Sequence, residues 1–125
     1  QGVGSMSEEQ SGKNRLLVAR LFKKTQEKSV AWLLNGNRDP MAELGAYRIT
    51  LDTSFSGSGM VENLYIFSLQ GELIEHLTDE SLDEVSTAPF GYESYYSLMS
   101  KLREMAFRQA VGADTAVDDI LDFLK

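Results

Sequence analysis

The feature that most constrains the fold is an alternation of apolar and polar residues in short segments that turn-forming residues separate. In the clearest segment, three apolar residues alternate with three polar ones: Tyr47, Ile49 and Leu51 with Arg48, Thr50 and Asp52. Neighbouring side chains of a strand point to opposite faces, so this pattern predicts a strand with one buried face. We expect strands over residues 28–34, 44–52, 62–69 and 72–77. The short loops between them favour an antiparallel meander of three or four strands.

Helices are expected on both sides of this meander. Apolar residues recur at spacings of three and four over residues 14–26, 92–111 and 115–124, which is typical of amphipathic helices. Gly112 directly follows the second of these segments, where a left-handed residue ends many helices. Asp114 or Thr115 can cap the last helix, and Thr78 or Asp79 can cap a short helical turn after the strands.

These elements predict an α+β fold with an N-terminal helix, the meander, and two C-terminal helices packed on one sheet face. The expected core contains large apolar residues from the three longer helices and from the strands other than 72–77: Leu17, Leu21, Val30, Trp32, Tyr47, Ile49, Leu51, Leu64, Ile66, Leu98, Leu102, Met105, Ile120 and Leu124. We assign residues 13–125 to a single domain. Residues 1–12 are expected to be a mobile N-terminus, in which residues 1–5 resemble the remnant of an expression tag before Met6.

The chain of 125 residues contains no cysteine, which excludes disulfides, thiol chemistry and cysteine-ligated metals. No apolar run approaches the roughly 20 residues of a membrane span, and no signal peptide is recognisable at the start. We therefore expect a cytoplasmic protein that does not interact with membranes.

The formal net charge of −7 is unevenly distributed. Residues 6–28 carry six bases and three acids, whereas no base and nine acids lie between Arg48 and Lys101. Such a negative region repels phosphate backbones, so we expect no nucleic-acid binding. It would attract a basic protein partner or the basic helix of a second copy. The acids expected to form an interaction surface are Glu72, Glu75, Asp79, Glu80, Asp83, Glu84, Asp114, Asp118 and Asp122.

His76 is the only histidine, and carboxylates flank it in the sequence. A histidine near carboxylates could bind a metal or act in acid–base chemistry. However, no second histidine or cysteine accompanies it, and on a strand Glu75 and His76 point to opposite faces. A solvated histidine on an edge strand is the favoured interpretation. The segment Ser56–Gly59 lacks the lysine of a phosphate-binding loop. We predict no catalytic residue, no metal site and no cofactor.

The C-terminal third resembles a group of small bacterial α+β proteins for which no activity is known. The resemblance is carried by Glu104-Met-Ala106 and Arg108-Gln-Ala110-Val-Gly112, followed by a short acidic helix that ends in leucine. Trp32, the strand around Tyr47 and the turn Phe67-x-x-x-Gly71 are similar in placement. The resemblance spans residues 13–125 and implies the same architecture, without implying an activity.

Three functional hypotheses follow. The first is a non-catalytic protein–protein interaction module, which could associate with itself through its opposed charges. The second is an acidic inhibitor, of the immunity-protein or antitoxin type, that blocks a basic partner. The third is an enzyme or small-ligand binder with an unrecognised site, which would require titratable groups to converge in a cleft.

Overall fold

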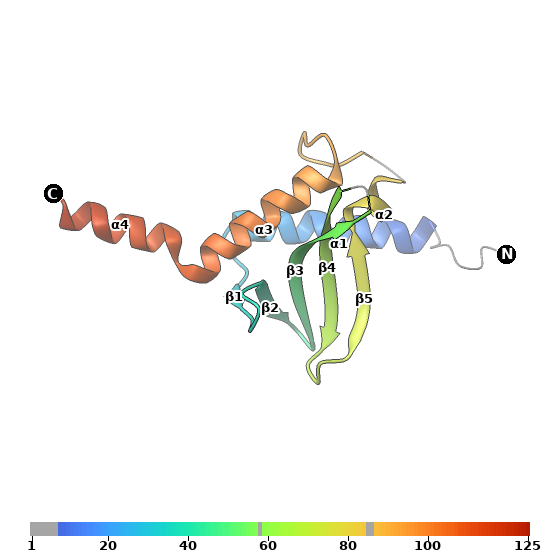
Figure 1. The fold of residues 1–125 in the computed structure, drawn as a ribbon, viewed down its shortest axis with the longest axis horizontal. Helices are drawn as coiled ribbons and strands as arrows, with labels where there is room; N and C mark the ends of the chain where they lie inside the picture. The colour runs from blue at the N-terminus through green and yellow to red at the C-terminus, as the bar shows by residue number, and fades with distance from the viewer. Residues whose placement is uncertain (1–7, 58, 85–86) are drawn as a thin grey trace.

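A computed structural model describes residues 8–57, 59–84 and 87–125 of the chain. The fold is α+β, with an N-terminal helix, an antiparallel sheet and two C-terminal helices (Figure 1). The elements are α1 (Glu8–Gln26), β1 (Leu33–Leu34), β2 (Pro40–Leu44), β3 (Tyr47–Ser56), β4 (Gly59–Ser68), β5 (Leu73–Thr78), α2 (Asp79–Asp83), α3 (Tyr95–Val111) and α4 (Ala113–Phe123).

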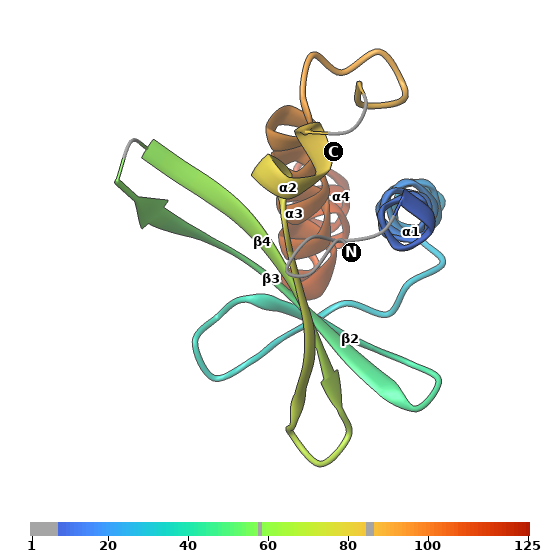
Figure 2. The same cartoon turned by 90° about the vertical axis from the view of Figure 1, so that its right-hand side faces the viewer.

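The sheet is a meander in which each strand pairs with its neighbour in the sequence, in the order β1-β2-β3-β4-β5. Helices α1 and α3 lie side by side on the same side of this twisted sheet (Figure 2), and α3 contacts β1, β2 and β4. The predicted fold class is therefore confirmed, although the sheet has five strands rather than three or four. Within the described residues, none of the helices combines the length and apolarity needed to cross a membrane.

The additional strand arises from the turn between β2 and β3. Gly45 adopts a left-handed φ of 65°, which lets the chain reverse after Leu44. The strand predicted over 44–52 is consequently divided between two strands. The strand predicted over 28–34 contracts to β1, although Val30 and Trp32 are still buried. The segment 54–59, expected to be a loose connector, instead continues the β3–β4 hairpin as far as the pair Ser56 and Gly59.

Several predicted turns and caps are confirmed. Gly112 is left-handed, with φ 69°, directly after α3, and Gly71 has a φ of 94° in the β4–β5 turn. Thr78 caps α2 by accepting a hydrogen bond from the backbone N–H of Ser81. The cap predicted for the last helix is wrong: α4 begins at Ala113 and has no side-chain cap. Its first turn follows Gly112 so closely that Thr115 already lies inside the helix.

The core lies between the sheet and helices α1 and α3. Eight of the predicted core residues are buried: Leu21, Val30, Trp32, Ile49, Leu51, Leu64, Leu98 and Leu102. Leu17, Ile66 and Met105 are partly buried and pack against them. The prediction is wrong for the three remaining residues: Tyr47, Ile120 and Leu124 are exposed. Tyr47 begins β3 beside the turn at Gly45, at the end of the strand, and the other two belong to α4.

The start of α1 also differs from the prediction. Residues 8–12, expected to be mobile, are helical, and Ser11 is buried. A side-chain hydrogen bond from Gln10 to Asn14 (3.0 Å) spans one turn of this segment, and Asn14 is buried as well. The first two turns of α1 thus pack against the rest of the protein. Residues 1–7 lie outside the described residues.

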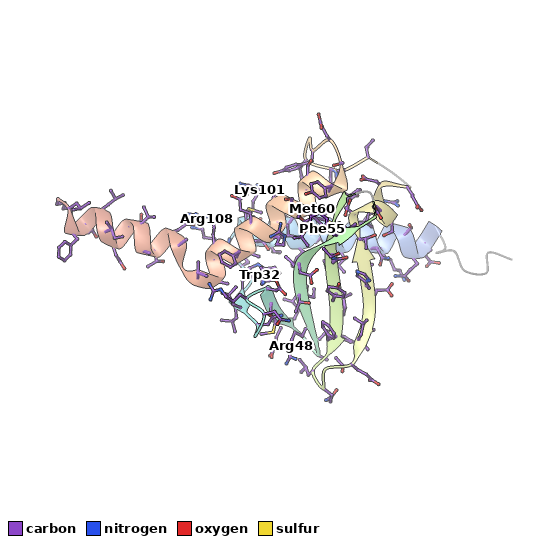
Figure 3. The ribbon with its side chains drawn as sticks, in the orientation of Figure 1. Trp32, Arg48, Phe55, Met60, Lys101 and Arg108 are labelled. Atoms are coloured by element: carbon purple, nitrogen blue, oxygen red, sulfur yellow. The ribbon has the colours of Figure 1, made fainter. Side chains whose placement is uncertain are left out.

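A buried polar contact joins the C-terminal end of α1 to the core. The indole Nε1–H of Trp32, which is labelled in Figure 3, donates to Oγ1 of Thr25 at 3.0 Å. Both side chains are buried. The side-chain amide of Gln109 on α3 donates to the backbone carbonyl of Thr25 at 2.7 Å. Thr25 therefore links α1, the segment before β1, and the last turns of α3.

Candidate protein-interaction surface

The C-terminal helix α4 projects away from the rest of the protein. In Figure 1 it continues past the end of α3, and the C-terminus lies far from the sheet. None of its residues is buried. Gly112 alone separates α3 from α4, and its backbone N–H still bonds to carbonyls of Arg108 and Gln109. The left-handed conformation of this residue turns the chain out of the path of α3.

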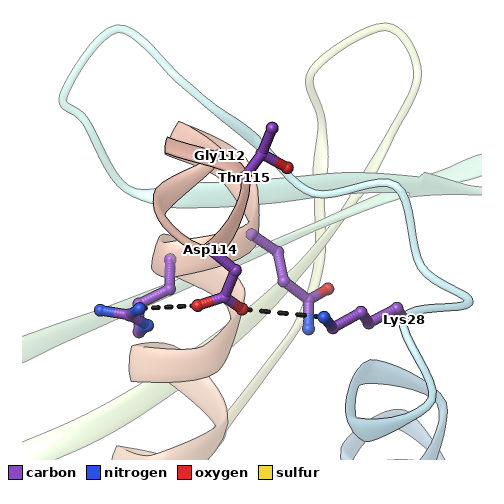
Figure 4. Close-up of a pocket in the computed structure, with 6 residues that line it drawn as sticks. Lys28, Gly112, Asp114 and Thr115 are labelled. Atoms are coloured by element: carbon purple, nitrogen blue, oxygen red, sulfur yellow. Dashed lines mark hydrogen bonds and ion pairs between the residues drawn. The ribbon is translucent and has the colours of Figure 1, made fainter. Parts of the chain in front are cut away.

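Two cations hold the first turn of α4 in place. The carboxylate of Asp114 accepts a hydrogen bond from Arg108 on α3 at 2.6 Å and lies 3.8 Å from Nζ of Lys28, just after α1 (Figure 4). The hydrogen bond from Arg108, followed by the charges of Arg108 and Lys28, lowers the pKa of Asp114. A cavity of about 200 Å³ opens between these residues and Gly112. The start of α4 thus forms solvent-accessible ion pairs with α3 and with Lys28 in the segment after α1.

One side of α4 is an exposed apolar stripe. The α4 stripe consists of Val117, Ile120, Leu121 and Leu124, whose exposed fractions are 50%, 58%, 60% and 72%. Their spacings of three and four place them along one side of the helix. Phe123 is 90% exposed next to the stripe. Because burying such side chains releases free energy, an exposed row of this kind is typical of a binding surface.

The polar side of α4 is acidic. Asp118, Asp119 and Asp122 are exposed there, and Asp118 and Asp122 are one turn apart. Asp122 also lies 3.6 Å from Lys125, and both of these side chains are well exposed. An ion pair that is so accessible contributes little free energy and can exchange partners easily. The helix therefore presents apolar and acidic groups together.

The acids predicted to share a surface do not come together. Asp79 is buried, where its Oδ1 accepts a hydrogen bond from the backbone N–H of Glu62 at 2.8 Å. Burial raises its pKa, and the hydrogen bond from Glu62 opposes that effect. Asp83 accepts from the backbone N–H of Tyr95 at 2.9 Å, at the start of α3. The prediction that Asp79 belongs to an exposed interaction surface is wrong, because its side chain is buried.

The other predicted acids lie at several separate places. Glu72 is exposed in the β4–β5 turn, Glu75 is half-buried in β5, and Glu80 and Glu84 are exposed in and just after α2. The whole of β5 separates Glu72 from Asp79, and Asp114, Asp118 and Asp122 belong to α4. The acids of α4 accompany the four exposed large apolar side chains of the α4 stripe, whereas Glu75 shares β5 with two, Leu73 and Ile74.

His76 is exposed on the edge strand β5, as the favoured interpretation predicted. Its Nε2 lies 2.8 Å from Oδ1 of Asn63, and its ring stacks on Tyr65 with 4.4 Å between ring centres. The amide of Asn63 donates in turn to Asp52 at 2.9 Å. Among the described residues, no group of three or more histidine, aspartate or glutamate side chains is placed to hold a metal.

A shallow apolar groove lies along α1. The α1 groove has a volume of about 180 Å³ and is lined by Leu17, Arg20, Leu21, Lys24, Val30 and Leu44. Arg20 and Lys24 are exposed, one turn apart on α1. Leu44 reaches the groove from the end of β2. The sequence did not predict this groove, because three separate segments contribute to it: α1, the residues before β1, and the end of β2.

Comparisons with protein-family models, with curated proteins and with solved structures gave no match to this chain. The resemblance to small bacterial proteins carried by Glu104-Met-Ala106 therefore stays a prediction. The assignment of residues 13–125 to one domain also stays a prediction. Functional conclusions rest on the geometry of the molecule itself.

Proposed function

We propose that this chain is a non-catalytic protein-interaction module and that α4 is its binding element. The observation that supports this most directly is the α4 stripe, in which four large apolar side chains are each at least half exposed on a helix that buries no residue. A helix of this pattern typically docks its apolar side in a groove of a partner protein.

The charge of α4 favours a protein partner over a membrane. Helices that lie on membrane surfaces are rich in lysine and arginine on the polar side, because the lipid surface is negative. The polar side of α4 carries Asp118, Asp119 and Asp122 instead, with Lys125 near its end. The same acids oppose binding to nucleic acid. We propose a protein partner and, since a chain without cysteine fits a reducing compartment, a cytoplasmic location.

The alternatives have less support. An acidic inhibitor would need a continuous negative surface, whereas Asp79 is buried and Asp83 bonds to the start of α3. Its remaining support is the acidic side of α4. For an enzyme or small-ligand binder, the candidate is the cavity beside Gly112, but its charged groups Lys28, Arg108 and Asp114 pair with one another.

The experiment is a capture assay with the full chain and two matched variants. The first variant, Ile120→Asp with Leu121→Asp, places charges in the α4 stripe. The control, Leu73→Asp, alters a side chain that is 54% exposed on β5, compared with 58% and 60% for the two stripe residues. We expect protein partners, a second copy included, to be retained by the wild type and the control and lost by the stripe variant. Equal capture by all three proteins would contradict the proposal.

A further inference from the structure

We propose that the partner of α4 is a second copy of this chain, and that the α4 stripe of each copy packs in the α1 groove of the other. This inference rests on the proposed function, because it names the protein that α4 binds. Both surfaces belong to the same polypeptide, so each copy carries a ligand and its acceptor.

The two surfaces match in length and in apolar character. Along α1 the groove runs from Leu17 to Lys24, and the α4 stripe runs from Val117 to Leu124. Each comprises eight residues, or about two helical turns of roughly 5.4 Å each. The floor of the groove is apolar, formed mainly by leucine and valine side chains. The α4 stripe and the α1 groove therefore match in length along their helices and in apolar character.

The charges at the two surfaces are complementary and have the same spacing. Arg20 and Lys24 are four residues apart on α1, and Asp118 and Asp122 are four residues apart on α4. Residues at this spacing lie one turn above another, so the two pairs have the same separation along their helices, and the acids at the polar border of the α4 stripe can reach the basic rim of the groove.

Both cations are accessible to such a partner. Arg20 has no ion pair among the described residues of the chain. The only ion pair of Lys24 within them is with Glu27 at 3.7 Å, and both side chains of that pair are well exposed. Paired charges at a rim contribute mainly to specificity and to the rate of association, while the apolar contact supplies affinity. The acids of α4 thus select a groove with a basic rim.

The position of the groove favours a closed dimer. Lys28, which binds Asp114 at the start of α4, lies only a few residues from Lys24 and Val30 of the groove. In the proposed dimer the two-fold axis lies beside the start of α4, so that each α4 extends toward the groove of the other copy. Stable interfaces bury roughly 1,200–2,000 Å² in total, and the reciprocal arrangement makes the helix–groove contact twice.

The test uses the full chain and a pair of charge-reversal variants. One variant is Asp118→Lys with Asp122→Lys, and the other is Arg20→Glu with Lys24→Glu. Each variant alone places like charges at the helix–groove contact, so we expect its dimer dissociation constant to rise at least tenfold at low salt. An equimolar mixture combines reversed helix with reversed groove and wild-type helix with wild-type groove, so we expect a heterodimer close to wild-type affinity.

Mass measured by sedimentation over protein concentrations from about 1 μM to about 1 mM covers weak and moderate dimers. We expect the wild type to dimerise, each variant alone to dimerise more weakly, and the mixture of the two variants to dimerise about as well as the wild type. Circular dichroism checks that the variants fold, and Glu72→Lys, a reversal at an exposed residue of the β4–β5 turn, is the control that should dimerise like the wild type.

Three results would overturn the inference. If the wild type stays monomeric at every concentration, α4 does not bind a second copy. The same result is expected if α4 folds onto the groove of its own chain. A dimer unaffected by either variant uses another surface, such as the edge of β5. If mixing the two variants does not restore dimerisation, the acids of α4 do not pair with the bases of the groove as proposed. If the α4 stripe still governs capture of another protein, only the identity of the partner is wrong; if it governs none, the proposed function fails as well.

Discussion

Arg103 on α3 and Glu62 on β4 form a bidentate ion pair that joins this helix to the sheet. Nε of Arg103 lies 2.8 Å from Oε1 of Glu62, and Nη2 of Arg103 lies 3.0 Å from Oε2 of Glu62. The Glu62 side chain is only 2% exposed, compared with 31% for Arg103. The hydrogen bond to Glu62 is the main reason why the pKa of Arg103 is raised, although burial opposes it.

Removing the cation should destabilise the fold. Arg103→Met leaves the buried carboxylate of Glu62 unpaired, and we expect it to lower the free energy of unfolding by about 3 kcal/mol. Urea denaturation at neutral pH measures this change. Lys101→Met is the matched control on the same helix, because Lys101 forms only an exposed pair with Glu104. Adding Glu62→Leu to Arg103→Met should recover most of the loss, and a double variant as unstable as the single one would contradict this account.

Asp79 should make stability depend on pH. Burial raises its pKa in the folded state above the ordinary value near 4. Below that value Asp79 is protonated in both states, and as the pH rises through the raised pKa the folded protein must ionise a buried group. Its contribution to stability is therefore lost with rising pH.

Two variants separate the charge of Asp79 from its hydrogen bond. Asp79→Asn keeps an acceptor for the N–H of Glu62 and should gain stability relative to wild type as the pH rises from about 4. Asp79→Ala leaves that N–H unpaired and should lose about 1–3 kcal/mol across the pH range. Thermal unfolding at a series of pH values provides the measurement. The account is contradicted if the difference in stability between Asp79→Asn and the wild type stays constant over this pH range.

Much of the sheet could be predicted from the sequence, because local patterns determine strands and turns. The alternation around Ile49 reports one buried face, and Gly71 marks the turn before β5. The turn at Gly45 was not predicted, since a single glycine inside an alternating segment does not by itself indicate that the chain reverses direction. The burial of Asp79 was missed because its partner, the N–H of Glu62, lies 17 residues away.

The position of α4 could not be predicted from its own residues. Its apolar stripe is what a helix of the core would also show, so Ile120 was assigned to the core, whereas it is 58% exposed. The deciding fact is tertiary: α3 already covers the sheet, and Gly112 directs the chain outward. The matching spacing of four at Arg20 and Lys24 and at Asp118 and Asp122 was the available sequence signal.

The contact between Thr25 and Trp32 should be measurable in the only tryptophan of the chain. Thr25→Val keeps the shape of the side chain but leaves the buried indole N–H without its acceptor, which should cost about 1–3 kcal/mol. Denaturation followed by tryptophan fluorescence reports both the stability and the local environment. Thr115→Val, at an exposed position of α4, should leave both unchanged. An equally stable Thr25→Val protein would show that another group accepts this hydrogen bond.

The ion pairs of Asp114 should restrict the orientation of α4. Because the chain has no cysteine, Ala31→Cys and Lys125→Cys, both at exposed positions, allow specific spin labelling. We expect Asp114→Asn to broaden the distribution of label distances at neutral pH, measured with excess unlabelled protein.

Lowering the pH should have the same effect on α4. The pKa of Asp114 is lowered by Arg108, so the contact is complete above the ordinary value near 4 and is lost as the pH falls through the lower value of the folded state. Asp119→Asn removes a charge from the same helix without touching Arg108 or Lys28, and its distribution should match the wild type. Equal widths for Asp114→Asn and wild type would show that Gly112 alone sets the direction.

A single residue, Gly112, connects the helix that packs on the sheet to the helix that projects from it. No flexible tether intervenes, so the direction of α4 relative to the sheet depends on the backbone angles of this one residue, which the ion pairs of Asp114 help to restrict. Force applied along α4 would be transmitted directly into α3. Lengthening this connection by a few glycines would leave both helices intact while uncoupling their directions.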